Sequence, residues 1–126
     1  MIRRGARREA STLASLQAAV IAFRDARDWA QFHNAKDACL SLALEAAELL
    51  ELTQWKQGDD LVRHLRRHRE DVADELSDIL YWVLLMAHDQ GIDLAAAFRR
   101  KLRKNARKYP VRKARGSSAK YARRRR

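Results

Sequence analysis

The chain has 126 residues, and its composition excludes several classes of protein. It is 47% hydrophobic and 34% charged, with one proline and four glycines, which excludes collagen-like, linker-like and turn-rich all-β chains. The single cysteine, Cys39, cannot form an internal disulfide, and no apolar run is long enough to span a bilayer. We therefore expect one soluble, cytoplasmic domain that does not interact with membranes.

The formal net charge of +11 is concentrated towards the C-terminus. Residues 99–126 contain 15 Lys or Arg and no acid, whereas residues 1–98 contain the other 12 cations and all 16 acids. We predict a domain over residues 1–110 and a basic, partly disordered tail over residues 111–126. Such a tail can bind phosphates, so a basic helical nucleic-acid-binding protein is the alternative function. The acidic charge of the remainder argues against nucleic acid as the main partner.

Helical spacing of apolar residues occurs in four segments, and no segment has the alternation of a strand. In chain order, the predicted helices cover about residues 11–29, 34–55, 59–88 and 93–108, with N-caps at Ser11, Asn34, Asp59 or Asp60, and Asp93. We expect Gly58 and Gly91 to follow the second and third helices, and Tyr109-Pro110 to stop the fourth. This pattern predicts an all-α bundle of about four helices per chain.

The second predicted helix has no Lys or Arg between Ala38 and Thr53, and its apolar residues go almost all the way round. Such a helix is buried on more than one side, and four short helices from one chain would cover its apolar surface poorly. We therefore predict a homo-oligomer whose bundle core is shared between subunits.

Two pairs of acids interrupt the apolar pattern. Glu45 and Glu48 share one face of the second helix, and Glu75 and Asp78 repeat this spacing in the third. If the two helices are antiparallel neighbours, all four carboxylates converge. Burying each charge alone would cost several kcal/mol, so either the pKa values rise or a cation lies among them.

An all-oxygen set of ligands selects a hard cation, so Mg²⁺ is the expected cofactor, with Mn²⁺ as a second possibility. Neither pair has the Glu-x-x-His pattern of di-iron bundles. The acids could instead form a solvated stripe. We favour a metal site because both pairs lie among aliphatic residues and have no basic partner four residues on.

Aromatic and basic residues add the other parts of a nucleotide site. Tryptophans near helix ends, such as Trp29 and Trp55, either pack in the core or stack on a planar base. Lys101 and Asn105 share a face of the fourth helix and are followed by Tyr109, and these groups could bind phosphates. Metal site, base slot and phosphate contacts together describe a nucleoside triphosphate.

The complete pattern resembles the MazG superfamily of all-α nucleotide pyrophosphohydrolases. Its signature is Glu45-x-x-Glu48 followed, after a gap of 26 residues, by Glu75-x-x-Asp78. Longer matches are similar to the dCTP pyrophosphatase group of that superfamily: Arg27-Asp28-Trp29, Gln31-Phe32-His33, Gln54-Trp55-Lys56, Lys101-x-x-x-Asn105 and Tyr109-Pro110. Trp82 and Val20 depart from the animal enzymes, which have tyrosine and histidine at these positions.

The resemblance implies a Mg²⁺-dependent hydrolase that converts a nucleoside triphosphate, dCTP or a modified pyrimidine dNTP, to the monophosphate and pyrophosphate. It implies a housecleaning role in the nucleotide pool and a tetramer, or dimer of dimers. Residue by residue, it assigns the metal to Glu45, Glu48, Glu75 and Asp78, the phosphates to Lys101, Asn105 and Tyr109, and the base pocket to Trp29, His33, Trp55 and Trp82. We predict Glu48 as the general base, with Glu45 as the next candidate, because crowding by other acids can raise a carboxyl pKa.

Overall fold

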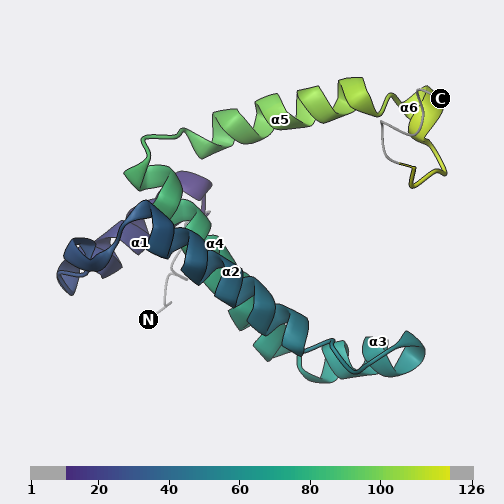
Figure 1. Cartoon of the computed structure of the whole chain (residues 1–126), viewed down its shortest axis with the longest axis horizontal. Coiled ribbons are helices and arrows are strands. Elements are labelled where there is room, and N and C mark those ends of the chain that lie inside the picture. The colour runs from purple at the N-terminus through teal and green to yellow at the C-terminus, as the bar shows by residue number, and fades with distance from the viewer. Residues whose placement is uncertain (1–10, 120–126) are drawn as a thin grey trace, which may run out of the picture. The chain divides into compact units, whose positions relative to one another are not determined.

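The computed structural model describes residues 11–119, which contain helices and loops but no strand. Within this described stretch, the chain divides after Gly91 into a first part with four α-helices and a second part with two (Figure 1). The first part contains α1 (Leu13–Ala26), the short 3₁₀ helix η1 (Ala30–Phe32), α2 (Ala35–Glu51), α3 (Gly58–Arg67) and α4 (Arg69–Asp89). The second part contains α5 (Leu94–Lys108) and α6 (Val111–Ala114). The all-α prediction is confirmed.

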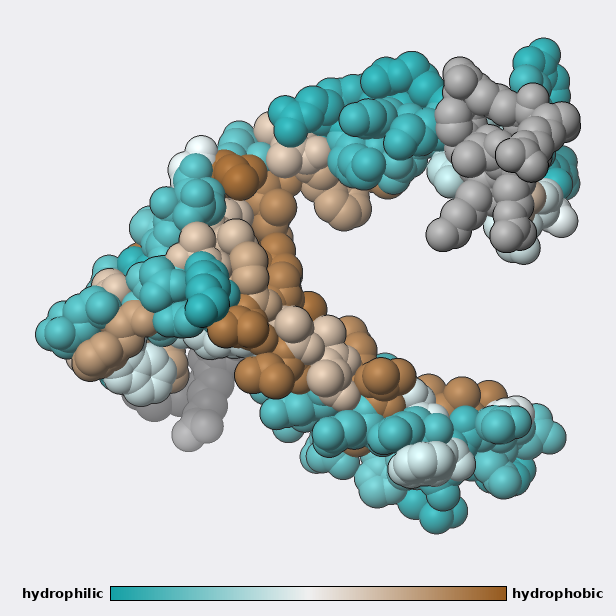
Figure 2. All heavy atoms as spheres, viewed as in Figure 1, coloured by the Kyte–Doolittle hydropathy of each residue, from teal (hydrophilic) through white to brown (hydrophobic). Residues whose placement is uncertain are grey.

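The core of the first part is small. Helix α4 runs alongside α2 in the opposite direction, and α1 also packs against α4 (Figure 1). The buried hydrophobic side chains in the described stretch are Ala38, Leu84, Leu85 and Ala87. Other hydrophobic residues lie at the surface along these helices, as the space-filling view shows (Figure 2). None of the described helices combines the length and the apolar character that crossing a membrane requires.

Two of the predicted N-caps are confirmed, and one is shifted by a residue. The Asn34 side chain accepts a hydrogen bond from the Asp37 N–H at 2.9 Å, and Asp93 accepts one from the Ala96 N–H at 3.1 Å. The cap of α1 is Thr12 rather than Ser11. Thr12 accepts from the Ser15 N–H at 3.0 Å while Ser15 Oγ accepts from the Thr12 N–H at 2.9 Å, and this reciprocal pair fixes the first turn.

The second helix is shorter in the structure than the helix predicted from the sequence. Helix α2 ends at Glu51, one turn before Trp55, and Leu52–Trp55 form turns. Thr53 donates both its N–H and its hydroxyl to the Leu50 carbonyl, each at 2.9 Å, so that the side chain competes with the helical bonding pattern. Gly58 is the first residue of α3 instead of the residue that ends α2, and Asp59 and Asp60 lie in the first turn of α3 rather than at its cap.

The third predicted helix is two helices. His68 leaves helical geometry at φ −103° and ψ 32°, and it separates α3 from α4. Hydrophobic spacing continues across this single residue, so the period alone could not reveal the break. With α6 added, the described stretch holds six α-helices where about four were expected. Helix α6 lies inside the predicted tail, while residues 120–126 lie outside the described stretch.

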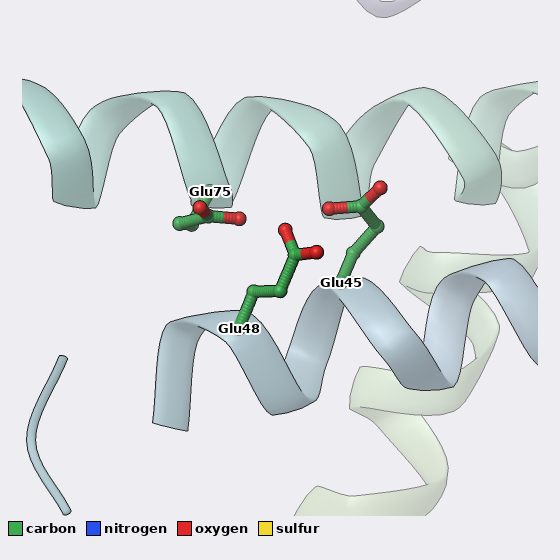
Figure 3. A group of neighbouring side chains, drawn as sticks. All are labelled: Glu45, Glu48 and Glu75. Atoms are coloured by element: carbon green, nitrogen blue, oxygen red, sulfur yellow. The ribbon is translucent and has the colours of Figure 1, made fainter. Parts of the chain in front are cut away.

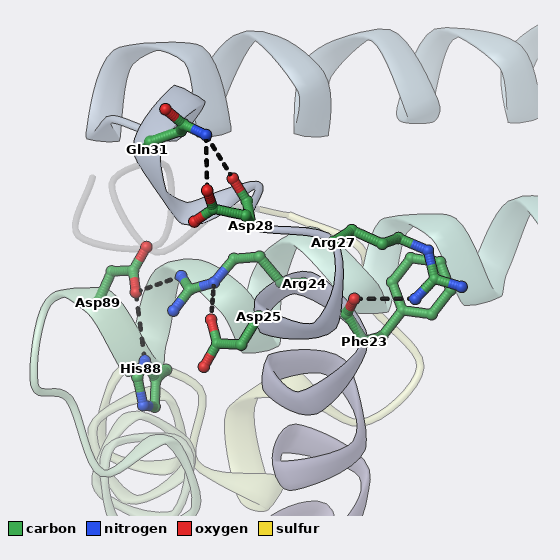
Figure 4. A network of polar contacts seen from close by, with 8 residues as sticks. All are labelled: Phe23, Arg24, Asp25, Arg27, Asp28, Gln31, His88 and Asp89. Carbon is green, nitrogen blue, oxygen red and sulfur yellow. Dashed lines mark hydrogen bonds and ion pairs between the residues drawn. The ribbon is translucent and has the colours of Figure 1, made fainter.

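A buried arginine joins the C-terminal end of α1 to that of α4 (Figure 4). Arg24 is 7% exposed, and its guanidinium lies 2.7 Å from Asp89 Oδ1 and 3.1 Å from Asp25 Oδ1. His88 Nδ1 lies 3.2 Å from the same Asp89 oxygen. These contacts link residues 65 positions apart and join the ends of α1 and α4.

The charges in this network shift each other's protonation. The hydrogen bond with Asp89 raises the pKa of Arg24, against the opposing effect of burial. Burial alone would raise the pKa of Asp89, but the hydrogen bonds and charges of Arg24 and His88 together hold it below its ordinary value. Asp89 therefore contributes stability above its unfolded-state pKa, and this contribution is lost as the pH falls through its folded-state pKa.

We expect Arg24→Gln to lower the free energy of unfolding by about 2 kcal/mol. Removing one member of a buried ion pair typically costs more than this, and partial exposure of Asp89 reduces the effect. Urea unfolding at neutral pH measures the change. The matched control is Arg63→Gln, because the ion pair of Arg63 with Asp60 is exposed and should contribute less than about 0.5 kcal/mol. Equal losses in both variants would contradict a special role for Arg24.

Candidate active site

Three glutamates converge between α2 and α4 (Figure 3). Glu45 and Glu48 project from consecutive turns of α2, and Glu75 faces them from α4. One carboxylate oxygen from each lies within 4.8 Å of the other two. Glu45 and Glu75 are partly buried, whereas Glu48 is exposed. The antiparallel packing of α2 and α4 therefore produces the acidic cluster that the two sequence pairs indicated.

Two oxygens of the cluster are left without partners in the described part of the chain. Glu45 Oε2 and Glu75 Oε2 are buried and have no hydrogen-bond partner among the described residues. Burial raises the pKa of Glu45, and the neighbouring carboxylates of Glu48 and Asp78 raise it further, while a hydrogen bond with Trp82 opposes the shift. Burial also raises the pKa of Glu75, with added contributions from Glu48, Glu45 and Asp78. Orphaned carboxylate oxygens at this spacing fit a hard divalent cation.

Asp78 lies at the edge of this cluster. It is exposed and is not among the three acids whose oxygens approach within 4.8 Å of one another. Its charge nevertheless acts on both Glu45 and Glu75. Asp78 also lines the neighbouring aromatic cleft, so it lies between the cluster and that cleft.

The aromatic cleft has a volume of about 290 Å³. Asp78 and five rings line it: Phe23, Trp29, His33, Tyr81 and Trp82. Neighbouring rings meet edge to face, with centroid distances of 5.8 Å for Phe23–Trp29, 6.2 Å for Phe23–Tyr81, 5.3 Å for Tyr81–Trp82 and 5.3 Å for His33–Trp82. His33 Nδ1 is buried without a hydrogen-bond partner among the described residues. The cleft thus offers flat apolar surfaces with two polar groups, as a planar heterocycle requires.

The turn after α1 brings Trp29 and His33 to the cleft. The Asp28 N–H donates to the Asp25 carbonyl at 3.0 Å, and the Trp29 N–H donates to the Arg24 carbonyl at 3.1 Å. This pair of bonds places Asp28 at the position where glycine is usual, with a φ of 53°. The Asp28 carboxylate accepts a hydrogen bond from Gln31 at 3.0 Å, which holds the short η1 helix against the turn (Figure 4).

Two aromatic side chains of the cleft, Phe23 and Tyr81, were not predicted as site residues. Tyr81 lies three positions after Asp78, so helical spacing could have placed the two on one face. Phe23 fitted the apolar face of α1 and gave no separate signal. The Arg27 guanidinium lies 3.6 Å from the Phe23 ring centroid and donates to the Phe23 carbonyl at 2.9 Å, which holds this ring in place.

The other predicted site residues lie elsewhere. Trp55 is in the α2–α3 loop, is 85% exposed and does not line the aromatic cleft. In the second part of the chain, Lys101 and Asn105 are one turn apart on α5, and the Tyr109 N–H donates to the Asn105 carbonyl at 2.8 Å. The roles predicted for these four residues stay predictions.

Comparison with known proteins identifies the family. A sequence model of the MazG-like family matches residues 40–123, which include the four acids of the signature. The chain belongs to the MazG-like family. The resemblance inferred from the carboxylate spacing is therefore confirmed.

This MazG-like chain is 41% identical to dCTP pyrophosphatase 1 of Bos taurus and 39% identical to that of Homo sapiens, each over 101 residues. These matches cover 79% of the chain but only about 60% of the length of these relatives. It is also similar to the crystal structure of a pyrophosphatase from Archaeoglobus fulgidus, with a TM-score of 0.75 and 33% identity. That match covers 83% of this chain and 98% of the other, so the similarity includes most of the helical fold.

Proposed function

We propose that the protein is a Mg²⁺-dependent nucleoside triphosphate pyrophosphohydrolase that acts on dCTP or a modified pyrimidine dNTP. The observation that supports this proposal is the glutamate cluster with two orphaned, buried oxygens next to an aromatic cleft. The relatives named dCTP pyrophosphatase 1 support the choice of pyrimidine substrate. Removal of modified or excess nucleotides from the pool is the corresponding role.

Glu45, Glu48 and Glu75 would hold the cation, with Asp78 as the next acid along α4. Mn²⁺ is the second candidate, because both ions prefer oxygen ligands. When bound, the cation neutralises charge on the triphosphate oxygens. The raised pKa values of Glu45 and Glu75 without a cation are consistent with this assignment. Both shifts arise because burial and the neighbouring carboxylates disfavour the charged forms, and a cation would offset these effects.

The side chains of this protein would supply the remaining functions. Glu48, the exposed acid of the cluster, would orient a water molecule and accept its proton as the water oxygen bonds to the α-phosphorus. The bond from the α-phosphorus to the bridging oxygen would break, and pyrophosphate would leave. Lys101, Asn105 and Tyr109 would contact the phosphates, and Trp29, His33 and Trp82 would stack around the base. The base-pocket role predicted for Trp55 stays a prediction.

A turnover assay tests this proposal directly. The purified protein is incubated with Mg²⁺ and a panel of standard and modified nucleoside triphosphates, and the products are separated by chromatography. Monophosphate plus pyrophosphate, abolished by EDTA, is the expected result. Diphosphate plus phosphate would show that a different bond is cleaved. The absence of any product across the panel would overturn the proposed activity.

The Phe23–Tyr81 pair should limit the size of the base. On its other side lies an apolar cavity of about 450 Å³, and both spaces are lined by these two rings. We expect Tyr81→Ala to join the two spaces and raise the kcat/KM of purine dNTPs relative to dCTP by at least ~10-fold. Tyr81→Phe keeps the ring and is the matched control. A ratio that is unchanged in the alanine variant would contradict the size limit.

We also propose that the protein is a homo-oligomer, either a tetramer or a dimer of dimers. Leu40, Leu44 and Leu50 on α2 are 51%, 64% and 63% exposed, a large apolar surface for one helix. A second copy would bury these side chains and extend the small core. Light scattering after gel filtration should give four times 14.6 kDa. A monomer at micromolar concentration would contradict this proposal. The cytoplasmic location stays a prediction.

A further inference from the structure

Helix α5 carries two opposed faces. Leu94, Phe98 and Leu102 recur every four residues along one side, and Phe98 and Leu102 are 61% and 54% exposed. Arg99, Arg103 and Arg107 recur with the same spacing. At 3.6 residues per turn, each arginine lies about 140° round the helix from the leucine or phenylalanine five positions before it. The helix therefore has an arginine row well separated from its apolar stripe, and most of α5 is hydrophilic in Figure 2.

The arginine row is also separate from the residues that we assign to the substrate phosphates. Arg103 lies two positions from both Lys101 and Asn105, which places it about 160° away from each round the helix. Side chains on opposite faces of one helix cannot bind the same small ligand. The arginine row is thus free for another partner even when Lys101 and Asn105 contact a triphosphate.

The positive charge of this row has no compensation within its part of the chain. Residues 92–119 contain ten Lys or Arg, and Asp93 is their single acid. The Asp93 side chain accepts a hydrogen bond from the Ala96 N–H and caps α5, so it lies at the start of the helix. Arg99 and Arg103 are four residues apart and repel each other. Both lie before the last turn of α5, so they do not gain the stabilisation that the helix dipole gives to cations in that turn. A bound polyanion would relieve this repulsion.

We propose that Arg99, Arg103 and Arg107 bind the phosphate backbone of a nucleic acid. Successive arginines are about 6 Å apart along the helix axis, and each guanidinium can bind a phosphate with two hydrogen bonds. An acidic membrane fits less well. When an amphipathic helix lies on a membrane, its apolar stripe enters the lipid and the opposite face is exposed to water. Cations that contact the lipid headgroups then lie beside the apolar stripe, whereas the arginine row of α5 lies on the far side from it. This surface lies on α5 and is independent of the proposed hydrolysis.

Fluorescence anisotropy of the full chain with a labelled single-stranded oligonucleotide of about 20 nucleotides, measured over a range of salt concentrations, tests the proposal. Three phosphate contacts predict that the logarithm of the association constant falls with the logarithm of salt with a slope of at least ~2. Replacing the three arginines by glutamine should lower this slope by about 2 and weaken binding at low salt by at least ~10-fold. The hydrolytic turnover of the variant should be unchanged.

The matched control replaces Arg63, Arg66 and Arg67 on α3 by glutamine, which removes the same charge from another helix. This control should keep the wild-type slope. An equal decrease of slope and affinity in the control variant would overturn the proposal. A salt slope near zero for the wild-type protein would also overturn it, and this measurement does not depend on any variant. Binding to vesicles of acidic lipid without binding to the oligonucleotide would also overturn it.

Discussion

Glu48→Gln should retain the fold and reduce dNTP hydrolysis by at least ~100-fold, the usual effect of losing a general base. Glutamine has nearly the same shape as glutamate but cannot accept the proton of the attacking water. Because Glu48 is exposed, the substitution leaves no buried group without a partner, and the melting temperature should change little. Steady-state kinetics with dCTP and Mg²⁺ measure the loss, and circular dichroism confirms that the helices are retained.

Glu51→Gln is the matched control for this variant. Glu51 is the last residue of α2, is exposed and lies outside the glutamate cluster, so the substitution makes the same chemical change on the same helix. Its turnover should stay within about 2-fold of the wild type. Near-normal turnover of Glu48→Gln would remove Glu48 from the role of base. Glu45→Gln is then the next variant to test.

Addition of Mg²⁺ should raise the melting temperature near pH 7.5 and have little effect near pH 4. The pKa values of Glu45 and Glu75 are raised in the absence of a cation. The stability that these two groups contribute is therefore present below their unfolded-state pKa values and is lost as the pH rises through the folded-state values. A cation binds the deprotonated carboxylates and restores stability at the higher pH. At about 100 times the dissociation constant the rise is on the order of 10 °C.

Thermal denaturation at several pH values, with Mg²⁺ or with EDTA, measures this effect. Subtracting the melting temperature in EDTA from that in Mg²⁺ at each pH removes the contribution of groups that bind no cation. Asp89 is such a group, and its lowered pKa gives the opposite dependence of stability on pH. Glu75→Gln should abolish the Mg²⁺ effect, whereas Asp74→Asn, a change at the neighbouring position, should keep it. A Mg²⁺ effect of the same size at pH 4, or in the Glu75 variant, would contradict the assigned metal site.

The convergence of the acids could be predicted in part. The three-residue spacing within each pair placed Glu45 with Glu48, and Glu75 with Asp78, on one face of each helix. The structure brings Glu45, Glu48 and Glu75 within 4.8 Å of one another but leaves Asp78 at the edge, beside the aromatic cleft. This division depends on how α2 and α4 are rotated against each other, which the spacing within one helix does not specify.

The aromatic cleft required still more of the tertiary structure. Phe23 comes from α1, Trp29 and His33 from the connection to α2, and Tyr81 and Trp82 from α4. The sequence indicated tryptophans near helix ends but not which of them meet. Trp55, equally close to a helix end, is exposed in its loop, because α2 ends one turn earlier than its apolar pattern.

The amino-acid sequence was sufficient to predict the features that depend on residues within a few positions of one another. These are the helical class, the caps at Asn34 and Asp93, and the carboxylate motif that identifies the MazG-like family. The contacts between distant residues, such as the ion pair of Arg24 with Asp89 and the edge-to-face contact of Phe23 with Tyr81 in the cleft, became visible only in the folded chain. Caps and periodicity arise from local hydrogen bonds and from the helical repeat, whereas these contacts depend on the packing of whole helices, to which every side chain at the interface contributes.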